Sequence, residues 1–432
     1  MYFFERNEAY EDRIICIDDE GRSYTYRQIW DWGDELTADC RGVVVLECSN
    51  DAESLARYLA LLRRGCPVIL IGKSLDEDAK ASLRDTYEGE YAVNSELGLL
   101  LSTSGSTGDR KLVRLSYDNI QANCDSIVEY LGITADERPI TTLPMEYTYG
   151  LSVIHSHVAA GATIILTNRT LFQREFWDMV EQYKVTSMAG VPYTYDMLER
   201  LRLREMDLPH LKTLTQAGGH LNEEVQKKYA KWAVETDRQF FVMYGQTEAT
   251  ARMSYIPPEK CAEKIGSIGI PVPGGSMAIA EDGELIYFGA NVSLGYATKR
   301  EDLSLGDENG GCLKTGDMAR MDEEGYFYII GRKKRFVKIQ GRRISLDKIQ
   351  DDLQEAFACE DIVCTGNDDD GITVYTSSRE VADRESETLN LFMEKWQVRA
   401  RFVRVYYLEE IPRNTSGKVL YSKLQTIKGE GR

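Results

Sequence analysis

Short apolar strands alternate with amphipathic helices at the start of the chain, and this alternation constrains the fold more than any other feature. Three predicted strands and two predicted helices follow one another in the order 13–19, 26–36, 41–48, 51–65 and 66–72. Such alternation is typical of a parallel sheet with helices packed against it. We therefore expect an α/β fold for the N-terminal part of the chain.

Two later segments predict antiparallel structure, and a third marks a change of domain. Residues 277–288 and 318–331 both read as β-hairpins, the first on an Asp-Gly turn. Residues 331–343 then carry seven Lys or Arg in thirteen positions of an otherwise acidic protein. We place a domain boundary there. The prediction is a large domain of residues 1–331, with parallel or mixed sheets, helices and a distorted antiparallel β region, and a small C-terminal α+β domain of residues 332–432.

The charge balance and the cysteines limit partners and location. The 432 residues include 70 Asp or Glu and 52 Lys or Arg, which gives a formal net charge of -18. Such a surface repels nucleic acid and anionic lipid, so we expect neither as a main partner. No apolar run is long enough to span a bilayer, and the first residues lack the apolar centre of a signal peptide. The nine cysteines include no C-x-x-C pair, which predicts buried thiols in a reducing cytoplasm.

The segment STSGSTGDRK, residues 102–111, has the composition of a phosphate-binding loop. It lacks the G-x-x-x-x-G-K-[ST] spacing of a P-loop, and the apolar runs on both sides predict strands, whereas a P-loop opens a helix. Ser116 is the expected N-cap of a helix over 117–132. The backbone N–H groups of a Gly-rich turn still bind anions, and the alternative is a surface turn without a ligand. The candidate phosphate ligands are Thr103, Ser104, Gly105, Ser106, Thr107, Gly108 and Lys111.

Three further segments carry the groups that ATP chemistry requires. In MYGQTEAT, Tyr244 offers a ring for adenine, Thr247 a hydroxyl for the α-phosphate, and Glu248 a carboxylate for Mg²⁺. In KTGD, Asp317 offers a carboxylate for both ribose hydroxyls, and the loop PRNTSGK ends on Lys418. Taken singly, each of these segments also reads as a turn or as solvated charge.

Together and in this order, the segments resemble the acyl-adenylate-forming superfamily, which comprises acyl- and aryl-CoA synthetases, peptide-synthetase adenylation domains and luciferases. The five signatures are found at 103–112, 244–248, 315–317, 331–344 and 412–418, so the resemblance runs along almost the whole chain. Three departures stand out. The first signature begins earlier than in full-length members, so the N-terminal subdomain looks shortened. Tyr147 stands where members often carry His, and Tyr421 where an Arg commonly follows the last signature.

The resemblance implies a two-step reaction that uses ATP and Mg²⁺. A carboxylate attacks the α-phosphorus of ATP to give acyl-AMP and pyrophosphate, and a thiol then displaces AMP. The resemblance also implies that the small domain is mobile, so that Lys418 acts only in the first step, and that the domain turns about a hinge at Lys334. The implied catalytic residues are Lys418, Thr247 and Glu248, the last of which would also bind the metal. Further implied nucleotide-binding residues are Gly218, Gly219, Tyr244, Gly245, Gln246, Asp317 and Arg332. Lys338 and Gly341 would line the thiol tunnel, and Tyr147, Thr148 and Gly150 the acid pocket.

The resemblance leaves the acid and the thiol open. Thr148 stands where peptide-synthetase adenylation domains carry the Asp that pairs with the substrate ammonium. Because a Thr cannot neutralise an ammonium, a fatty or aryl acid is favoured over an amino acid, although Glu146 nearby offers a carboxylate in a presumed strand or loop. The acceptor is CoA or the phosphopantetheine arm of an acyl or peptidyl carrier protein. The alternative function is a free-standing amino-acid adenylation enzyme that loads a carrier protein.

Two readings outside this superfamily are disfavoured. A P-loop kinase or ATPase disagrees with the spacing of residues 102–111 and would release ADP rather than AMP. A catalytically inactive binding module would be expected to have lost Lys418, Glu248 or Asp317, and all three are present.

Overall fold

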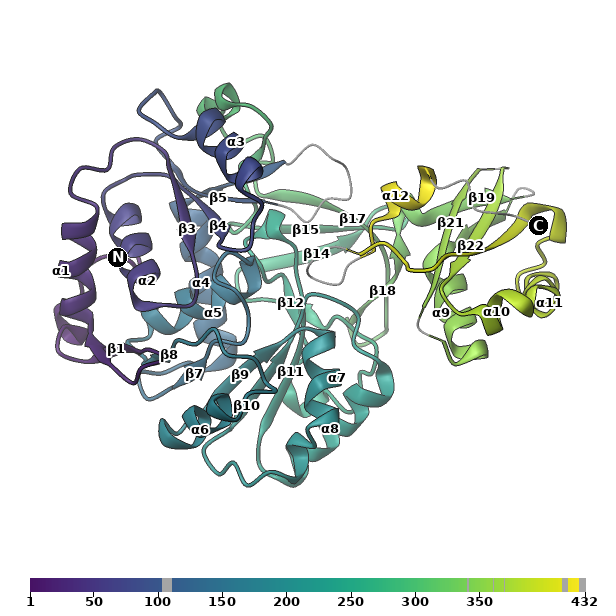
Figure 1. Cartoon of the computed structure of the whole chain (residues 1–432), viewed down its shortest axis with the longest axis horizontal. Helices are drawn as coiled ribbons and strands as arrows, with labels where there is room; N and C mark the ends of the chain where they lie inside the picture. The colour runs from purple at the N-terminus through teal and green to yellow at the C-terminus, as the bar shows by residue number, and fades with distance from the viewer. Residues whose placement is uncertain (103–110, 340–341, 360, 369, 414–418, 427–432) are drawn as a thin grey trace.

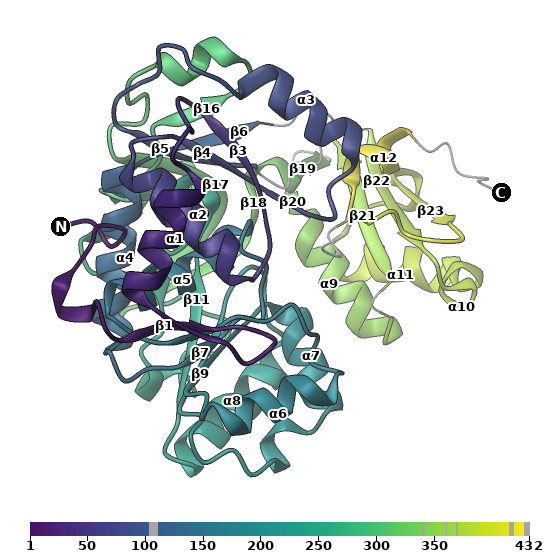
Figure 2. The same ribbon diagram turned by 60° about the vertical axis from the view of Figure 1, so that its left-hand side comes forward.

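The structure is a computed structural model that describes residues 1–102, 111–339, 342–359, 361–368, 370–413 and 419–426. Figure 1 shows a large body that carries all elements up to β18 and a smaller body, at the right, that carries the elements from β19 onward. The chain passes from one body to the other at β18, and the turned view of Figure 2 shows the same division.

The largest sheet has nine strands. In spatial order these are β13 (Ile270–Pro271), β12 (Ser254–Tyr255), β11 (Gln239–Tyr244), β10 (Thr213–Gln216), β9 (Ser187–Gly190), β7 (Pro139–Ile140), β8 (Ile164–Ile165), β1 (Ile14–Ile17) and β2 (Ser23–Thr25). The strands from β11 to β1 are parallel, and antiparallel strands flank them at both edges. A parallel sheet is therefore present, although of the three predicted strands it contains only the first, as β1.

A second sheet has five strands. In spatial order these are β16 (Gly295–Ala297), β6 (Leu112–Ser116), β5 (Leu97–Ser102), β4 (Val68–Gly72) and β3 (Val44–Cys48). Strands β3, β4 and β5 are parallel, whereas β6 and β16 are antiparallel additions. The predicted strand at residues 13–19 is β1 of the nine-stranded sheet. The next two predicted strands are β3 and β4 of the five-stranded sheet. Local patterning predicts each strand but not its partner, because pairing is decided by packing between distant segments.

Eight α-helices accompany these sheets in the described part of the large body. They are α1 (Tyr26–Leu36), α2 (Ala52–Arg63), α3 (Glu77–Tyr87), α4 (Tyr117–Leu131), α5 (Thr148–Ala159), α6 (Arg174–Gln182), α7 (Pro192–Arg200) and α8 (Glu223–Glu235). Helix α1 has the bounds that the sequence predicts. Ser116 caps α4 through a reciprocal capping box with Asn119, which confirms the expected N-cap.

The apolar clusters show how these layers stack. The side chains of α1, α2, α4 and α5 form one core that contacts strands of both sheets. The opposite face of the nine-stranded sheet packs against α6, α7 and α8, and the opposite face of the five-stranded sheet against α3. The result is an alternation of helix and sheet layers, as expected when parallel strands are buried on both faces.

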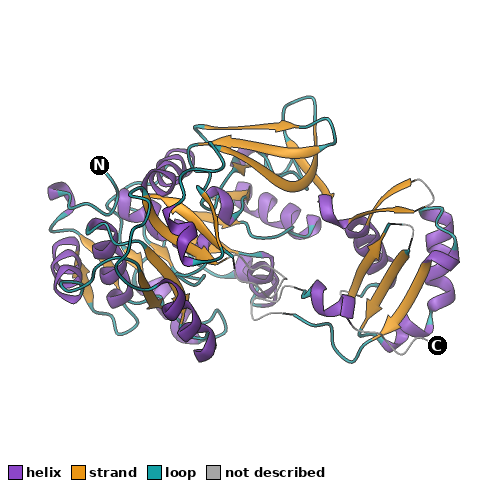
Figure 3. Ribbon diagram, turned by 90° about the horizontal axis from the view of Figure 1, so that it is seen from above, coloured by secondary structure: helices purple, strands orange, loops and turns teal. Residues whose placement is uncertain are grey.

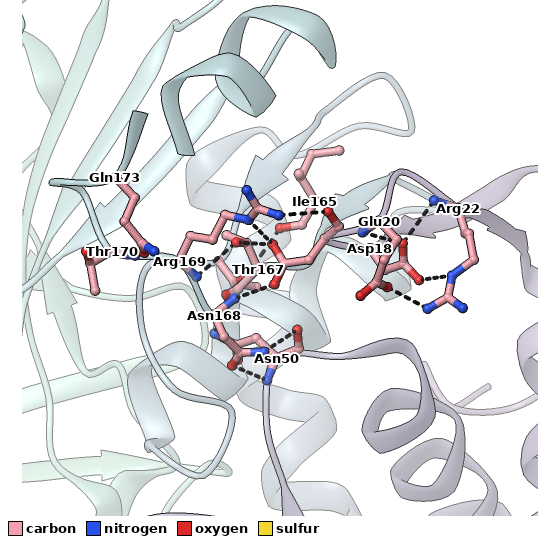
Figure 4. A network of polar contacts seen from close by, with 12 residues as sticks. Asp18, Glu20, Arg22, Asn50, Ile165, Thr167, Asn168, Arg169, Thr170 and Gln173 are labelled. Atoms are coloured by element: carbon pink, nitrogen blue, oxygen red, sulfur yellow. Dashed lines mark hydrogen bonds and ion pairs between the residues drawn. The ribbon is translucent and has the colours of Figure 1, made fainter. Parts of the chain in front are cut away.

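Asn50 ties the two sheets together where their strands end. It follows β3, and its side-chain amide donates to the carbonyl oxygens of Leu143 and Thr167 at 3.1 Å each. Asn168, just beyond β8, accepts from the Asn50 backbone N–H at 3.2 Å. Figure 4 shows Asn50 and Asn168 facing each other within this polar network.

Both predicted hairpins belong to one antiparallel sheet. Its strands are β14 (Gly275–Ile279), β15 (Glu284–Gly289), β17 (Cys312–Met321) and β18 (Phe327–Arg332), in that spatial order. Pairing of β14 with β15 and of β17 with β18 confirms the two hairpins. Figure 3 shows this sheet standing apart from the parallel layers.

The smaller body is α+β, as the composition break predicts. It contains the ribbon β19 (Phe336–Ile339) and β20 (Arg342–Ser345), and a sheet of β21 (Ile362–Asn367), β22 (Gly371–Thr376) and β23 (Val403–Tyr407). Its helices are α9 (Leu346–Phe357), α10 (Arg379–Asp383), α11 (Glu385–Lys395) and α12 (Tyr421–Thr426). One apolar cluster joins the ribbon, the sheet and helices α9, α10 and α11, and a second one joins α12 to β21 and β22.

Two expectations about the whole chain can be compared with the structure. All nine cysteines are free thiols, and six of them are buried while Cys40, Cys312 and Cys359 are half-buried, so the prediction of buried thiols holds for the six. Among the described residues, no helix is long and apolar enough to cross a membrane.

Candidate active site

The predicted phosphate loop connects two paired strands. Ser102 at the end of β5 lies opposite Leu112 at the start of β6, which confirms the strand-loop-strand arrangement. Residues 103–108, the candidate phosphate ligands of this loop, lie outside the described residues. Lys111 is described, and its ammonium lies 5.7 Å from the ring centroid of Tyr296 in β16.

Tyr296 also contacts the predicted metal residue. Its hydroxyl donates a hydrogen bond of 2.8 Å to Oε1 of Glu248, which lies in a short 3₁₀ turn, η3 (Thr247–Ala249), directly after β11. Burial and the neighbouring Glu248 carboxylate raise the pKa of Tyr296, so the hydroxyl remains the donor. One tyrosine therefore touches both Lys111 and Glu248.

Residues from three separate signatures meet around Asp317. The Tyr244 hydroxyl donates to Oδ2 of Asp317 at 2.5 Å, and Nε2 of Gln246 donates to the same oxygen at 3.0 Å. Gln246 also donates to the Thr315 carbonyl oxygen at 2.9 Å, and Nε of Arg332 lies 3.5 Å from Oδ1 of Asp317. Segments 244–248, 315–317 and 331–344 thus converge on one buried carboxylate.

The protonation of Asp317 depends on these partners. Burial raises the pKa of the Asp317 carboxyl, and the Tyr244 hydroxyl, Arg332 and Gln246 oppose that rise because they favour the charged form. The carboxylate of Asp347 in α9, on the other side of the linker, raises it further. Burial likewise raises the pKa of Tyr244 well above its usual value, which keeps its hydroxyl a donor.

The chain between Tyr244 and Arg252 turns back on itself. A Cβ on Gly245 would lie 1.6 Å from the carbonyl oxygen of Ala251, so only glycine fits there. Thr250 and Ala251 both have positive φ, at 56° and 106°, which is unusual for residues other than glycine. The guanidinium of Arg252 is buried and donates to the side chains of Ser152 and Tyr130, and these contacts hold the end of the loop.

The predicted nucleotide-binding glycines Gly218 and Gly219 are crowded by protein atoms. Gly218 has φ of +82°, and a Cβ there would lie 2.5 Å from the hydroxyl oxygen of Tyr147. A Cβ on Gly219 would lie 3.1 Å from the ring of Pro192. The structure therefore gives both glycines a packing reason, and it brings the 217–219 segment against the predicted acid-pocket residue Tyr147.

The predicted acid-pocket segment is the start of a helix. Thr148 is the first residue of α5 and Gly150 lies within it, whereas the strand or loop presumed for Glu146 agrees with its position before the helix. Gly150 is buried against the Pro144 carbonyl oxygen, which a Cβ would approach to 2.4 Å. Glu146, in the turn before the helix, points toward Gly72 at the end of β4, and burial raises the pKa of its carboxyl.

Lys334 lies between residues that are bound to opposite bodies. It belongs to the short 3₁₀ turn η6 (Lys333–Arg335). Lys333 forms an ion pair with Glu284 of the antiparallel sheet at 2.7 Å, whereas Arg335 forms an ion pair with Asp347 of α9. In the part of the chain that the structure describes, Lys334 itself makes neither a hydrogen bond nor an ion pair.

The remaining predicted residues lie in the smaller body. Lys338 is exposed on β19, and its backbone N–H donates to Asp368 at 2.6 Å. Gly341 and Lys418 lie outside the described residues. The residues that flank Lys418's loop, Arg413 and Val419, pair with each other through an antiparallel bridge.

The donor set suits magnesium bound together with phosphate. Among the described residues, no three His, Cys, Asp or Glu side chains gather in a way that would hold a metal alone. Glu248 and Thr247 offer one carboxylate and one hydroxyl on adjacent positions. Mg²⁺ typically takes one or two protein carboxylates and completes its shell with phosphate oxygens and water. The chemistry of the site therefore fits Mg²⁺ bound with a nucleotide.

Sequence reasoning missed Tyr296 and Arg252. Tyr296 is separated from Lys111 by 185 positions and belongs to no short segment that predicts nucleotide binding; the register of β16 on β6 places it there. Arg252 follows the 244–248 signature closely, but nothing local indicates that its charge is buried.

Comparison with known proteins agrees with the arrangement of these segments. Residues 36–297 match the AMP-binding enzyme family, and the chain belongs to that family. It is an enzyme similar to acyl-CoA synthetases. The 2-succinylbenzoate–CoA ligase of Bacillus pumilus is 28% identical over 360 residues, which cover 78% of this chain and 70% of that ligase. The feruloyl-CoA synthase of an Amycolatopsis species is 29% identical over 334 residues, which cover 74% and 65%.

The fold is also found in solved structures. The o-succinylbenzoate CoA synthetase of Bacillus subtilis, in complex with its acyl-adenylate intermediate, aligns with a TM-score of 0.78 at 21% sequence identity. The alignment covers 98% of this chain and 96% of that one. The large N-terminal and small C-terminal parts predicted from the sequence are thus those of the adenylate-forming fold.

Proposed function

We propose that the protein activates a carboxylic acid with ATP as an acyl-adenylate, releases pyrophosphate, and transfers the acyl group to CoA. The observation that carries this proposal is the convergence on Asp317 of Tyr244, Gln246 and Arg332, which come from distant signatures. The relatives cited above are CoA ligases and CoA synthases by name, which supports CoA rather than a carrier-protein arm as the acceptor.

Each described site residue has a defined task in the first step. Asp317 accepts the ribose hydroxyls, Tyr244 lies against the nucleoside, and Thr247 donates to the α-phosphate. Glu248 would hold Mg²⁺ together with the nucleotide, and the metal would neutralise charge on the phosphates. Lys111 and the loop before it take the outer phosphates. The substrate carboxylate oxygen attacks the α-phosphorus and pyrophosphate leaves, so catalysis consists of positioning and charge neutralisation.

The second step needs a movement of the smaller body. We assign residues 1–331 to the large domain and 332–432 to the small one, with Lys334 as the pivot. The contacts of Lys333 with the large body and of Arg335 with the small body support this division. Lys418 serves acyl-adenylate formation, and after rotation Lys338 and Gly341 line the path of the thiol, which attacks the acyl carbonyl and releases AMP.

The acid is one without an α-ammonium, such as a fatty or aryl acid. Thr148 cannot neutralise an ammonium, and Glu146 points toward Gly72 while the neighbouring Tyr147 points toward Gly218. This divergence supports the view that Glu146 does not substitute for an amino-pairing carboxylate.

Pyrophosphate exchange tests the proposal directly. The purified protein is screened with fatty, aryl and amino acids, and acids that support exchange are incubated with ATP and CoA for product analysis by mass spectrometry. We expect acid-dependent AMP and pyrophosphate formation, and an acyl-CoA product. Formation of ADP and phosphate would overturn the reaction class, and exchange with amino acids alone would overturn the substrate class.

A further inference from the structure

Tyr296 occupies the space between two predicted ligands of magnesium and phosphate. Its hydroxyl donates to Glu248 at 2.8 Å, and the Lys111 ammonium lies 5.7 Å from its ring centroid. No ion pair joins Lys111 with Glu248 in the described part of the chain. The tyrosine therefore contacts a cation with its ring and an anion with its hydroxyl.

The backbone of Tyr296 is held rigidly. Tyr296 pairs with Val113 across β16 and β6, two positions after Lys111. The guanidinium of Arg114 is fully buried, and its Nε donates to the Tyr296 carbonyl oxygen at 3.1 Å. A buried, multiply bonded guanidinium is costly to displace, so the Cα position of Tyr296 is fixed relative to β6.

The same segment also fixes the backbone of the metal-binding turn. The Ser293 N–H donates to the Glu248 carbonyl oxygen at 2.9 Å. The Asn291 side-chain amide donates to the Ala249 carbonyl oxygen at 2.8 Å, and Thr250 donates to the Asn291 carbonyl oxygen at 2.7 Å. Segment 291–296 thus positions Glu248 through its backbone, and Tyr296 orients its carboxylate.

A separation of charges is the consequence. Glu248 and Lys111 have opposite charges and contact different parts of one side chain, its hydroxyl and its ring, so without this side chain they would be free to approach and neutralise each other. A paired Glu248 would be a poorer magnesium ligand, and a paired Lys111 a poorer phosphate ligand.

We propose that Tyr296 is a positioning residue for magnesium-ATP, which holds the Glu248 carboxylate and the Lys111 ammonium apart and aims each at its own part of the nucleotide. This inference rests on the proposed function and adds to it a residue that does not itself react. The side chain is 42% exposed, so substitution creates no buried cavity that would threaten the fold.

Equilibrium binding without the acid substrate tests the role. ATP affinity is measured by calorimetry with Mg²⁺ and again with EDTA, for the wild type, Tyr296→Phe and Tyr296→Ala. Loss of a hydrogen bond to a charged group is expected to weaken magnesium-ATP binding about ten-fold in Tyr296→Phe. Tyr296→Ala also loses the ring contact with Lys111 and is expected to weaken it by about a further three-fold. Phe288→Ala, an aromatic side chain with the same 42% exposure on β15, is the matched control and is expected to bind like the wild type.

The comparison with and without metal separates positioning from a structural role. In EDTA, Tyr296→Phe should bind ATP like the wild type, because Glu248 then has no metal to hold. Equal binding of wild type and Tyr296→Phe with Mg²⁺, or equal weakening with and without Mg²⁺, would overturn the inference. A wild type that binds no ATP and supports no pyrophosphate exchange would instead overturn the proposed function itself.

Discussion

The hydrogen bond from Tyr244 to Asp317 makes a testable prediction about pH. Tyr244→Phe removes one of the two donors to Oδ2 of Asp317 and leaves the other, Gln246, in place. A hydrogen bond to a charged group contributes roughly 1.5–3 kcal/mol, and because Gln246 remains we take the lower end, about 1.5 kcal/mol. That energy favours only the ionised carboxylate, so its loss makes Asp317 easier to protonate.

The expected shift follows from the energy. Since about 1.4 kcal/mol corresponds to one pH unit, protonation of Asp317 should occur about one pH unit higher in Tyr244→Phe than in the wild type. A protonated Asp317 cannot accept both ribose hydroxyls. Nucleotide binding should therefore weaken as pH falls through the pKa of Asp317, and the weakening should begin about one unit earlier in the variant.

AMP binding by calorimetry from about pH 8.5 down to about pH 4, close to the ordinary pKa of an aspartate, measures this limb. AMP carries the ribose but needs no outer-phosphate contacts, and its own phosphate titration cancels when the variant is compared with the wild type. Tyr26→Phe is the control, because Tyr26 is a buried tyrosine whose hydroxyl donates to the carbonyl oxygens of Val158 and Ala162 and not to a carboxylate among the described residues. A Tyr244→Phe limb that coincides with the wild-type limb, in a folded protein, would refute the reasoning.

Three further predictions concern catalysis, backbone geometry and acid stability. Lys418→Ala should slow acyl-adenylate formation about 10²–10³-fold while transfer from a supplied acyl-adenylate survives. Lys334→Pro should keep acyl-adenylate formation and lose transfer. Single-turnover assays of the two half-reactions measure this, and equal loss of both in Lys418→Ala would contradict it. Gly245→Ala places a Cβ 1.6 Å from the Ala251 carbonyl oxygen, so the loop must shift. We expect about 1–3 kcal/mol of destabilisation, measured by denaturant unfolding, and at least about ten-fold weaker magnesium-ATP binding, measured by calorimetry. Burial lowers the pKa of His155 to about 3, below the value of about 6.5 in the unfolded chain. The free energy of unfolding should therefore fall as pH drops from about 6.5 toward about 3, by about 2–3 kcal/mol at about pH 4.5. A His155→Gln variant whose unfolding keeps the full acid dependence would exclude His155 as its cause.

Several local features were predictable from the sequence. The bounds of α1, the cap of α4 at Ser116 and both antiparallel hairpins agree with the structure. These features depend on side-chain periodicity, capping and turn residues, which act over a few positions. The order of the five signatures was enough to predict the family, since a family match needs only residue identities along the chain.

The sequence predicted candidate site residues but not their contacts with one another. The sequence named Tyr244, Gln246 and Asp317 as nucleotide residues, but not that they bond to one another. It left Glu146 as a candidate partner for an ammonium, whereas the structure points it toward Gly72 and starts a helix at Thr148. The direction of a side chain in a turn depends on what packs around it, and that information is absent from the local pattern.

What the sequence alone determined is the set of elements, the identity of the family and the chemical groups of the site. What only the tertiary structure decided is which distant segments touch: the division of the first strands between two sheets, the burial of Arg252, and the placement of Tyr296 between Lys111 and Glu248. The physical reason is range. Helix periodicity and caps are set by neighbours within about four positions, whereas strand pairing and side-chain contacts between residues far apart in the chain are set by the burial of whole layers against one another.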